Sequence, residues 1–428
     1  MVSFKVEVTS KEIIKPSSPT PPHLKTLQLS FIDQFQPSVH VPLLFFYQNE
    51  PTQDPIDHAE RSSLLKKSLS NVLVHFYPLA GRIKDKSSID CNDEGVEFYE
   101  ANVSSNLSEV IEKPNLEDLK RLLPFEPTAH DRNIILGVQV NQFSCGGMAI
   151  GVCFSHKIAD GIACTFFMRA WATMARGVSN EDHDHHVVAN RNFIAASYFP
   201  PRDNVNGTQT KEVALRKEKI VTRRFVFNRK MIDALKEQAL NTLDGPQETA
   251  PTNAEVVTAF IWKLLMKVEG QGTTYNPNLC KTSFAVVSVD MRPRMAPPMP
   301  EDCSFGNFSW FNFTDSVNVR DCEAEHVKLV PMLRKAATKI DANYIKNLQC
   351  GHEQNQTEMK KGDNTGIVQM CCFTSVWCDY PIYEVNFGWG KPTWVCTVSI
   401  PFKNLVMLMS TRGANNSTQA RYTQARLG

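Results

Sequence analysis

Residues 134–161 read IILGVQVNQFSCGGMAIGVCFSHKIADG, and this stretch decides the expected fold. Two apolar runs, 134–143 and 148–155, have the length and composition of strands. The glycine-containing spacing between them, SCGG, is typical of a β-hairpin. After Gly161 the apolar residues recur at helical spacing until Arg176-Gly177, where the glycine suits a helix C-terminus. The segment His156–Asp160 is therefore predicted to join a strand to a helix.

The second of these strands has one face made of small residues. Large and small side chains alternate along it, and the small ones are Ala149, Gly151, Cys153 and Ser155. Because successive side chains of a strand point to opposite faces, the small residues share one face. We expect another segment of the chain to pack closely there.

Further elements are predicted on both sides of this stretch. The proline-rich segment Lys15–Pro22 cannot be helical and is predicted to be an extended arm. Helical spacing runs from Ser62 to His75 and ends in a turn at 77–82. Thr252-Asn253-Ala254-Glu255 forms a capping box that opens a helix to about Lys267. Strands are predicted at 27–29, 41–47, 221–227 and 284–289, and another helix at 229–240.

Length and composition are those of a globular protein with more than one lobe. At 428 residues the chain exceeds a single hydrophobic core, so we expect two lobes joined by a polar crossover at 200–219. With 46 basic and 45 acidic residues, it lacks the concentrated positive charge that attracts nucleic acids or anionic membranes. The first residues lack a signal-peptide pattern, and no apolar run there approaches the length of a membrane helix. We expect a cytoplasmic protein without a nucleic-acid or membrane partner.

No metal site is expected. The twelve cysteines lack the paired spacing of zinc ligands, and the adjacent Cys371 and Cys372 fit neither a zinc ribbon nor a redox motif. The run Glu181–His186 contains metal-binding residue types, but no further ligand stands near it. This favours a solvated loop.

The strongest candidate for chemistry is the pair His156 and Asp160. The chain has no Gly-x-Ser-x-Gly motif and no phosphate-binding glycine loop, which argues against serine catalysis and nucleotide binding. A histidine at the end of a buried strand has a basicity suited to accepting a hydroxyl proton near neutral pH. Taken alone, such a pair is more often structural. Its combination with other segments changes this interpretation.

Six segments in order along nearly the whole chain together resemble the BAHD family of plant acyltransferases, in particular its alkaloid O-acetyltransferase and alcohol acyltransferase branches. They are PSSPTP at 16–21, HFYPLAGR at 75–82, HKIAD at 156–160, DMRPRM at 290–295, FGN at 305–307 and NFGWG at 386–390. The resemblance implies an α/β protein of two lobes, each like chloramphenicol acetyltransferase, with a mixed sheet, flanking helices and a channel between the lobes. We expect 1–200 and a returning segment of about 386–410 in the first lobe, and 215–385 with 411–428 in the second.

The resemblance implies an acyl-CoA-dependent O-acyltransferase. Because a self-contained two-lobe enzyme has no need of a partner, we expect a monomer. The expected donor is acetyl-CoA, and the expected acceptor is a hydroxyl of a plant secondary metabolite or a small alcohol. The family's catalytic histidine matches His156, the general base. Asp160 is expected to turn away and pair with Arg292 in a structural role, and a triad in which Asp160 orients the imidazole is the alternative.

Other site residues follow from the same resemblance. Ser375 and Trp377 are expected to donate to the oxyanion, although a packed core tryptophan explains the second equally well. Thr252 and Asn253 are expected beside CoA, although the capping box explains Thr252 without a ligand.

Two features depart from the family pattern. Asn386 stands where the family has aspartate, in a motif with Gly388 and Gly390 that the resemblance implies is structural, so we expect reduced stability. After Met409 the polar residues 415–419 stand where the family has an apolar strand and a closing helix. We expect that this tail cannot replace a buried strand and that the second lobe is truncated. These departures keep open a catalytically impaired homologue with a binding or regulatory role. N-acylation of an amine uses the same base and stays open as well.

Overall fold

The structure is a computed structural model in which the chain divides into two compact units. It describes residues 4–49, 57–128, 132–177, 192–203, 220–240, 250–270, 282–299, 304–319, 322–352, 368–377, 380–398, 402, 404–412 and 418–425. The first unit comprises Met1–Arg216, Pro300–Phe308 and Tyr380–Pro401, and the second comprises Lys217–Met299, Ser309–Asp379 and Phe402–Gly428. Residues 204–219 of the expected crossover and the run 181–186 lie outside the described residues.

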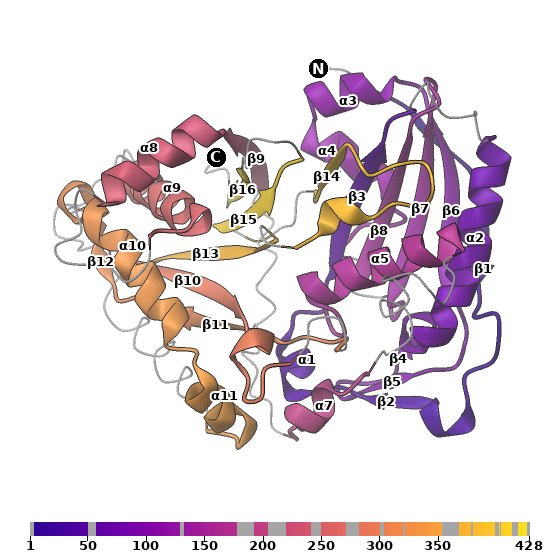
Figure 1. Cartoon of the computed structure of the whole chain (residues 1–428), viewed down its shortest axis with the longest axis horizontal. Coiled ribbons are helices and arrows are strands. Elements are labelled where there is room, and N and C mark those ends of the chain that lie inside the picture. Colours follow the sequence, from indigo (N-terminus) through magenta and orange to yellow (C-terminus); the bar gives the residue numbers. More distant parts are fainter. Residues whose placement is uncertain are drawn as a thin grey trace. The chain divides into compact units, whose positions relative to one another are not determined.

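A mixed sheet forms the centre of the first unit (Figure 1). Its strand order is β1 (Val6–Ile14), β6 (Val96–Val103), β7 (Leu136–Phe143), β8 (Met148–Ser155), β3 (His40–Tyr47) and β14 (Trp394–Cys396). Only the β6–β7 pair among these is parallel. Every residue of β3 is buried, as expected for an apolar run that is covered on both faces. A smaller sheet contains β2 (Thr26–Gln28), β5 (Ser88–Asp90) and β4 (Arg82–Ile83).

The predicted hairpin of β7 and β8 is confirmed. The two strands pair in antiparallel register, and Gly146 N donates to Phe143 O at 2.9 Å to close the turn. Gly146 has φ +81°, a left-handed conformation that glycine adopts without strain.

The close packing expected on the small face of β8 is also confirmed. A Cβ built on Gly151 lies only 2.1 Å from Leu122 O, so the backbone of that neighbouring segment leaves no room for a side chain. The segment belongs to the turn that follows α4 (Leu116–Leu119), a short 3-10 helix at Lys120–Leu122.

Helices cover the opposite face of this sheet. The helix α2 (His58–His75) packs on α5 (Gly161–Arg176), and Trp171 Nε1 donates to Ser68 Oγ at 3.1 Å between them. Phe167 of α5 contacts Phe154 of β8 edge to face, with ring centroids 5.5 Å apart. Short helices complete the unit: α1 (Phe31–Phe35), α3 (Leu107–Glu112) and α7 (Ala195–Tyr198).

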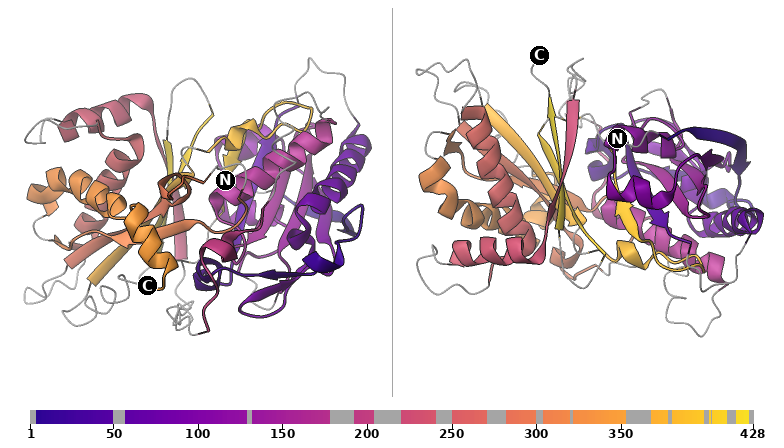
Figure 2. Two further views of the ribbon diagram at one scale, coloured as in Figure 1. Left: turned by 60° about the horizontal axis from the view of Figure 1, so that its bottom comes forward. Right: turned by 90° about the horizontal axis from the view of Figure 1, so that it is seen from above.

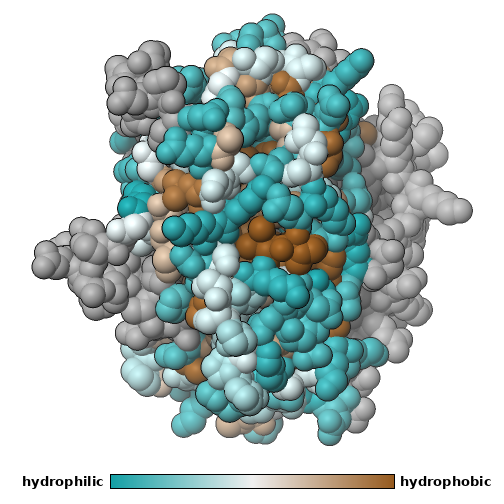
Figure 3. All heavy atoms as spheres, turned by 90° about the vertical axis from the view of Figure 1, so that its right-hand side faces the viewer, coloured by the Kyte–Doolittle hydropathy of each residue, from teal (hydrophilic) through white to brown (hydrophobic). Residues whose placement is uncertain are grey.

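The surface over α2 and β1 is mostly hydrophilic, with small apolar patches between the polar side chains (Figure 3). Lys66 of α2 contributes to this surface, with Nζ 2.5 Å from Glu12 Oε1 and 2.7 Å from Glu100 Oε2. Among the described residues, no helix is long and apolar enough to span a bilayer.

The second unit is built on another mixed sheet. Its main order is β11 (Ser309–Phe313), β10 (Thr282–Asp290), β13 (Val368–Trp377), β15 (Leu405–Ser410), β16 (Thr418–Ala425) and β9 (Ile220–Phe227), and β12 (Val317–Asn318) also pairs with β10. The central pairs β10–β13 and β13–β15 are parallel. Because β15 pairs with β13, residues 402–410 belong to this unit and the returning segment of the first unit ends earlier than 410.

The expectation that the polar tail cannot replace a buried strand is wrong for the backbone. Strand β16 lies between β15 and β9 and pairs with both, so that Ala420 stands opposite Leu408 on one side and Phe225 on the other. Main-chain N–H and C=O groups supply these bonds whatever the side chains are, and a polar segment can therefore complete a sheet.

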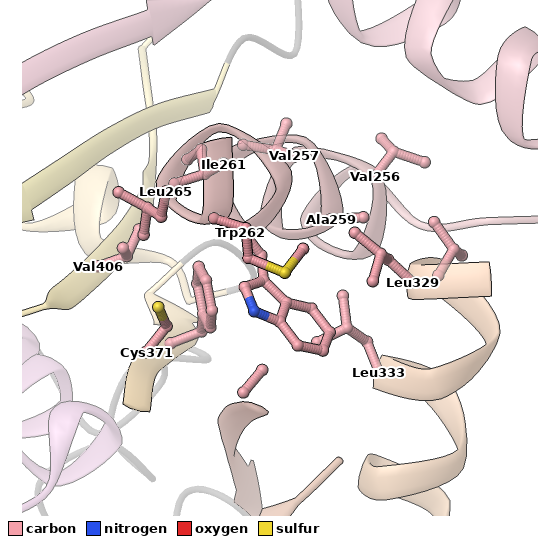
Figure 4. Packing of buried hydrophobic residues seen from close by; sticks show 14 of the residues in the cluster. Val256, Val257, Ala259, Ile261, Trp262, Leu265, Leu329, Leu333, Cys371 and Val406 are labelled. Atoms are coloured by element: carbon pink, nitrogen blue, oxygen red, sulfur yellow. The ribbon is translucent and has the colours of Figure 1, made fainter. Parts of the chain in front are cut away.

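Helices α8 (Arg229–Leu240), α9 (Asn253–Gly270) and α10 (Cys322–Thr338) lie on one face of this sheet (Figure 2), and α11 (Ala342–Gln349) follows α10. The core beneath them centres on Trp262, which points from α9 toward Leu329 and Leu333 of α10 and Cys371 of β13 (Figure 4). Its Nε1 donates to Ser283 Oγ at 2.9 Å, so the buried indole has a partner.

Candidate active site

His156 stands directly after β8, where the chain turns into α5. Its backbone N–H donates to Val39 O at 2.9 Å, which continues the hydrogen bonding toward β3 beyond the end of the strand. Asp160 caps α5, with Oδ1 accepting from Ala163 N at 3.0 Å. Gly177, with φ +69°, ends the helix as predicted. The predicted strand-to-helix junction is confirmed, and both ends of the His156–Asp160 segment are held by backbone hydrogen bonds.

The imidazole of His156 is half-buried, and one of its nitrogens is enclosed. Nδ1 is buried and has no hydrogen-bond partner among the described residues. Burial lowers the pKa of His156 below its ordinary value and outweighs the residue's own backbone carbonyl, the charge of Asp160 and the Asn307 side chain, which act to raise it. The ring is therefore neutral at pH 7 and able to accept a proton.

Both carboxylate oxygens of the buried Asp160 accept from backbone N–H groups. Oδ1 takes the helix-capping bond, and Oδ2 accepts from Phe308 N at 2.9 Å. This carboxylate thus joins the start of α5 to the segment Pro300–Phe308 of the same unit.

Two residues that sequence reasoning did not assign to the site contact the backbone of His156 or each other. Asn307 Nδ2 donates to His156 O at 2.8 Å and to Asp33 Oδ1 at 2.7 Å. Asp33 lies in α1, where it forms a capping box with Ser30. The pattern Ser30-Phe31-Ile32-Asp33 was readable as a capping box, but nothing in it indicated a link to His156.

Lys157 extends away from the imidazole toward the end of α1. Its Nζ donates to Gln34 O at 2.9 Å, and burial lowers its pKa to about 8. The amine is still mostly protonated at pH 7, and an ammonium on a helix-terminal carbonyl stabilises α1 near Asp33.

Several expected site residues belong to the second unit. Arg292 is fully buried, with Nη1 3.1 Å from Asp290 Oδ1, and the expected pairing with Asp160 stays a prediction. Ser375 and Trp377 lie in β13, and their side chains are outside what the structure describes.

The capping box at the start of α9 is confirmed. Glu255 N donates to Thr252 Oγ1 at 3.1 Å, and Thr252 N donates to Glu255 Oε2 at 2.8 Å. Arg334 of α10 binds both carboxylate oxygens of Glu255 at 2.8 Å. Thr252 is exposed and Asn253 is half-buried at this helix start.

The NFGWG motif forms a compact turn in the first unit. Asn386 Oδ1 accepts from Gly388 N at 2.9 Å and Gly390 N at 3.0 Å, and the guanidinium of Arg176 donates to Asn386 O. The two glycines have φ +118° and +97°, a backbone conformation that other residues rarely adopt. A Cβ on either would meet nothing within 4 Å, so the backbone angle and not a lack of space explains why glycine stands there. The amide oxygen of Asn386 thus makes bonds that an aspartate oxygen would also make. No cluster of three or more metal-binding side chains occurs within the described ranges.

Comparison with known proteins places this geometry in a family. The profile of the transferase family matches residues 4–423. The chain is 37% identical over 415 residues to stemmadenine O-acetyltransferase of Catharanthus roseus, covering 95% of this chain and 91% of that one. It is 36% identical over 424 residues to vinorine synthase of Rauvolfia serpentina, covering 96% and 92%. The crystal structure of vinorine synthase has a TM-score of 0.81, covering 99% of this chain and 95% of that one at 34% identity.

More distant structures share the fold. TRI101 of F. sporotrichioides, complexed with coenzyme A and T-2, has a TM-score of 0.69 at 19% identity and covers 94% of this chain and 95% of that one. The fold and the similarities to acetyltransferases define an acyl-CoA-dependent O-acyltransferase. The chain belongs to the transferase family of this class, the BAHD acyltransferases that its motifs resemble.

Proposed function

We propose that this acyltransferase moves an acetyl group from acetyl-CoA to a hydroxyl of a plant secondary metabolite, with His156 as the general base. The activity named for stemmadenine O-acetyltransferase supports an acetyl donor and an oxygen acceptor. A cytoplasmic location and a monomeric state complete the proposal and stay predictions.

The neutral, half-buried imidazole of His156 is the observation that carries the proposal. Its Nδ1 is enclosed by protein, so Nε2 is the nitrogen available to a substrate. Burial lowers the pKa of His156, and the ring therefore carries a free lone pair at neutral pH.

The proposed reaction needs no acyl-enzyme. Nε2 of His156 removes the proton of the acceptor hydroxyl while the oxygen attacks the thioester carbonyl. The new C–O bond gives a tetrahedral oxyanion, which collapses as the C–S bond breaks. The imidazolium then returns its proton to the departing thiolate, so that the products are the ester and free CoA.

The other residues have supporting roles in this proposal. Asp160 acts structurally, because its two oxygens already accept from Ala163 N and Phe308 N, and Arg292 is its proposed charge partner. Ser375 and Trp377 are the proposed oxyanion donors.

Thr252 and Asn253 are proposed to contact CoA at the start of α9. The N-terminus of a helix presents free N–H groups and partial positive charge, which suits the phosphates of CoA. The Thr252 hydroxyl accepts from Glu255 N and also hydrogen-bonds the Glu255 carboxylate, so the backbone N–H groups of the helix start are the donors proposed for the ligand.

The experiment that tests this function measures release of free CoA from acetyl-CoA with pooled alcohols, amines and alkaloids. The His156→Ala variant should lower turnover by about two to four orders of magnitude, the usual contribution of a general base. The exposed His23→Ala serves as the control for removal of a histidine outside the site. Full turnover by a folded His156→Ala would refute the mechanism, and release that depends only on amines would establish N-acylation.

The impaired homologue has lost part of its support. Its grounds were Asn386 and the polar tail, yet the amide oxygen of Asn386 accepts both glycine N–H groups and the tail backbone forms β16. No CoA release from the folded protein with any acceptor would still favour it.

A further inference from the structure

Asp33, Asn307 and His156 are joined by hydrogen bonds within the first unit, and the reaction described above uses only the histidine. Asp33 is 3% exposed and Asn307 is fully buried. A buried carboxylate and a buried amide are costly to desolvate, and their hydrogen bonds therefore indicate what they do.

Every lone-pair position of Asp33 faces a donor. Oδ2 accepts from Ser30 N at 2.8 Å and from Ser30 Oγ at 2.6 Å. Oδ1 accepts from Asn307 Nδ2 at 2.7 Å and from Asn307 N at 3.3 Å. Burial raises the pKa of Asp33, while these four donors act to lower it. The arrangement suits an ionised carboxylate, which only accepts, and it accepts from both the backbone N–H and the side-chain amide of Asn307.

The orientation of the Asn307 amide follows from its partners. Asp33 Oδ1 and the backbone carbonyl of His156 are both acceptors, and each takes one hydrogen from Nδ2. Nδ2 has only two hydrogens, so a flipped amide would lose both bonds. Oδ1 of Asn307 is consequently directed away from Asp33.

Two buried atoms on neighbouring side chains are left without partners. They are Asn307 Oδ1 and His156 Nδ1, and neither has a hydrogen-bond partner among the described residues. One is an acceptor, and the other is a ring nitrogen that can carry a hydrogen. Asn307 donates to the backbone of His156, and its side chain also lies within hydrogen-bonding reach of the imidazole, where it acts to raise the pKa of His156.

We propose that Asp33 and Asn307 form a positioning relay in which Asn307 Oδ1 accepts the Nδ1 hydrogen of His156 and Asp33 holds the amide in that orientation. The inference rests on the proposed role of His156 as base. With hydrogen on Nδ1, the lone pair lies on Nε2, where the acceptor hydroxyl is deprotonated. When Nε2 becomes protonated, the amide oxygen stabilises the imidazolium. Asp33 thereby orients the imidazole of His156 through the Asn307 amide. Asp160 does not orient the imidazole in this proposal, because its oxygens accept from backbone N–H groups.

Three variants separate positioning from folding. Asn307→Leu removes the amide oxygen that would accept from His156 while keeping a similar side-chain volume. Asp33→Asn removes the negative charge that holds the Asn307 amide in its orientation. Ser30→Ala is the matched control, because it weakens the capping box on the same carboxylate but leaves both bonds to Asn307. Glu109→Gln disturbs the similar capping box of α3, away from His156.

The first measurement is the ¹⁵N spectrum of the histidine rings in the intact protein, with His156 assigned from His156→Ala. We expect the Nδ1–H tautomer in the wild type and a gain of the Nε2–H tautomer in Asn307→Leu. An Nε2–H tautomer in the wild type overturns the relay, whatever the variants do. This readout is independent of turnover, so it stands even if the His156→Ala assay refutes the proposed function.

The second measurement is kinetic. Asn307→Leu and Asp33→Asn should each lower kcat by about 10- to 100-fold, the usual effect of losing a residue that orients a functional histidine, with KM for acetyl-CoA little changed. Ser30→Ala and Glu109→Gln should keep kcat within about twofold of the wild type. Equal loss of kcat in Ser30→Ala and Asp33→Asn, or unchanged kcat in Asn307→Leu, would show that the residues act only in folding.

Discussion

Replacing Gly151 by alanine tests how tightly the first unit is packed behind β8, the strand that leads to His156. Gly151 lies in the middle of β8, and an added Cβ would stand 2.1 Å from Leu122 O and 3.1 Å from Leu44 Cδ2. The nearer contact is with backbone, which cannot rotate away as a side chain can. The turn that carries Leu122 must therefore move.

The expected cost follows from two effects. Overfilling a packed core costs about 1–3 kcal/mol. Movement of Leu122 O also loses its bond with Asn141 Nδ2, at 2.9 Å, while that amide keeps Ala149 O at 3.2 Å, and one such bond is worth about 0.5–1.5 kcal/mol. Together these predict a loss of about 1.5–4.5 kcal/mol in the free energy of unfolding. At about 2–4 °C per kcal/mol, the melting temperature should fall by about 3–18 °C.

Thermal unfolding followed by circular dichroism measures this loss. The control is Gly177→Ala at the end of α5, where φ is +69° and a Cβ would meet nothing within 4 Å. It should cost about 1–2 kcal/mol for the left-handed backbone alone. Asn141→Ala shares the same carbonyl, so its effect should add incompletely to that of Gly151→Ala. If Gly151→Ala is no less stable than Gly177→Ala, the packing argument is refuted.

Three further predictions concern the site and its supports. Asn386→Asp should add about 1 kcal/mol to the free energy of unfolding and so raise the melting temperature, because a carboxylate accepts more strongly from the motif's two N–H groups and lies near the Arg176 guanidinium. An unchanged or lower melting temperature in a thermal scan would contradict this. Burial lowers the pKa of His156, so the neutral base persists below pH 6.5 and kcat/KM should decline only below that pH; a half-maximum above pH 6.5 contradicts the assignment. Asp160→Ala should lower both turnover and stability, at a cost of about 2–4 kcal/mol, because it removes a helix cap and the carboxylate oxygen that accepts from Phe308 N. Normal melting with selective loss of turnover would instead support the triad.

Local chemistry along the chain was sufficient to predict much of the fold. The alternating residues of β8, the glycines of its hairpin and the capping box at Thr252 each state a local requirement, and each prediction is confirmed. The polar tail was misjudged for the same reason. Side-chain hydropathy reports what can be buried, whereas β16 is held by main-chain pairing that no side-chain pattern reveals.

By itself, the sequence determined the class of protein and the strand-to-helix junction that presents His156, the proposed base. It could not reveal how that base is oriented. Asn307 is 151 residues from His156 and 274 from Asp33 along the chain, and neither residue stands in a recurring local pattern with the histidine. Asn307 contacts Asp33 and His156 only because the segment Pro300–Phe308 folds onto α1 and the end of β8. Hydrogen bonds between distant segments depend on tertiary packing, and so the surroundings of His156 were decided by the folded structure alone.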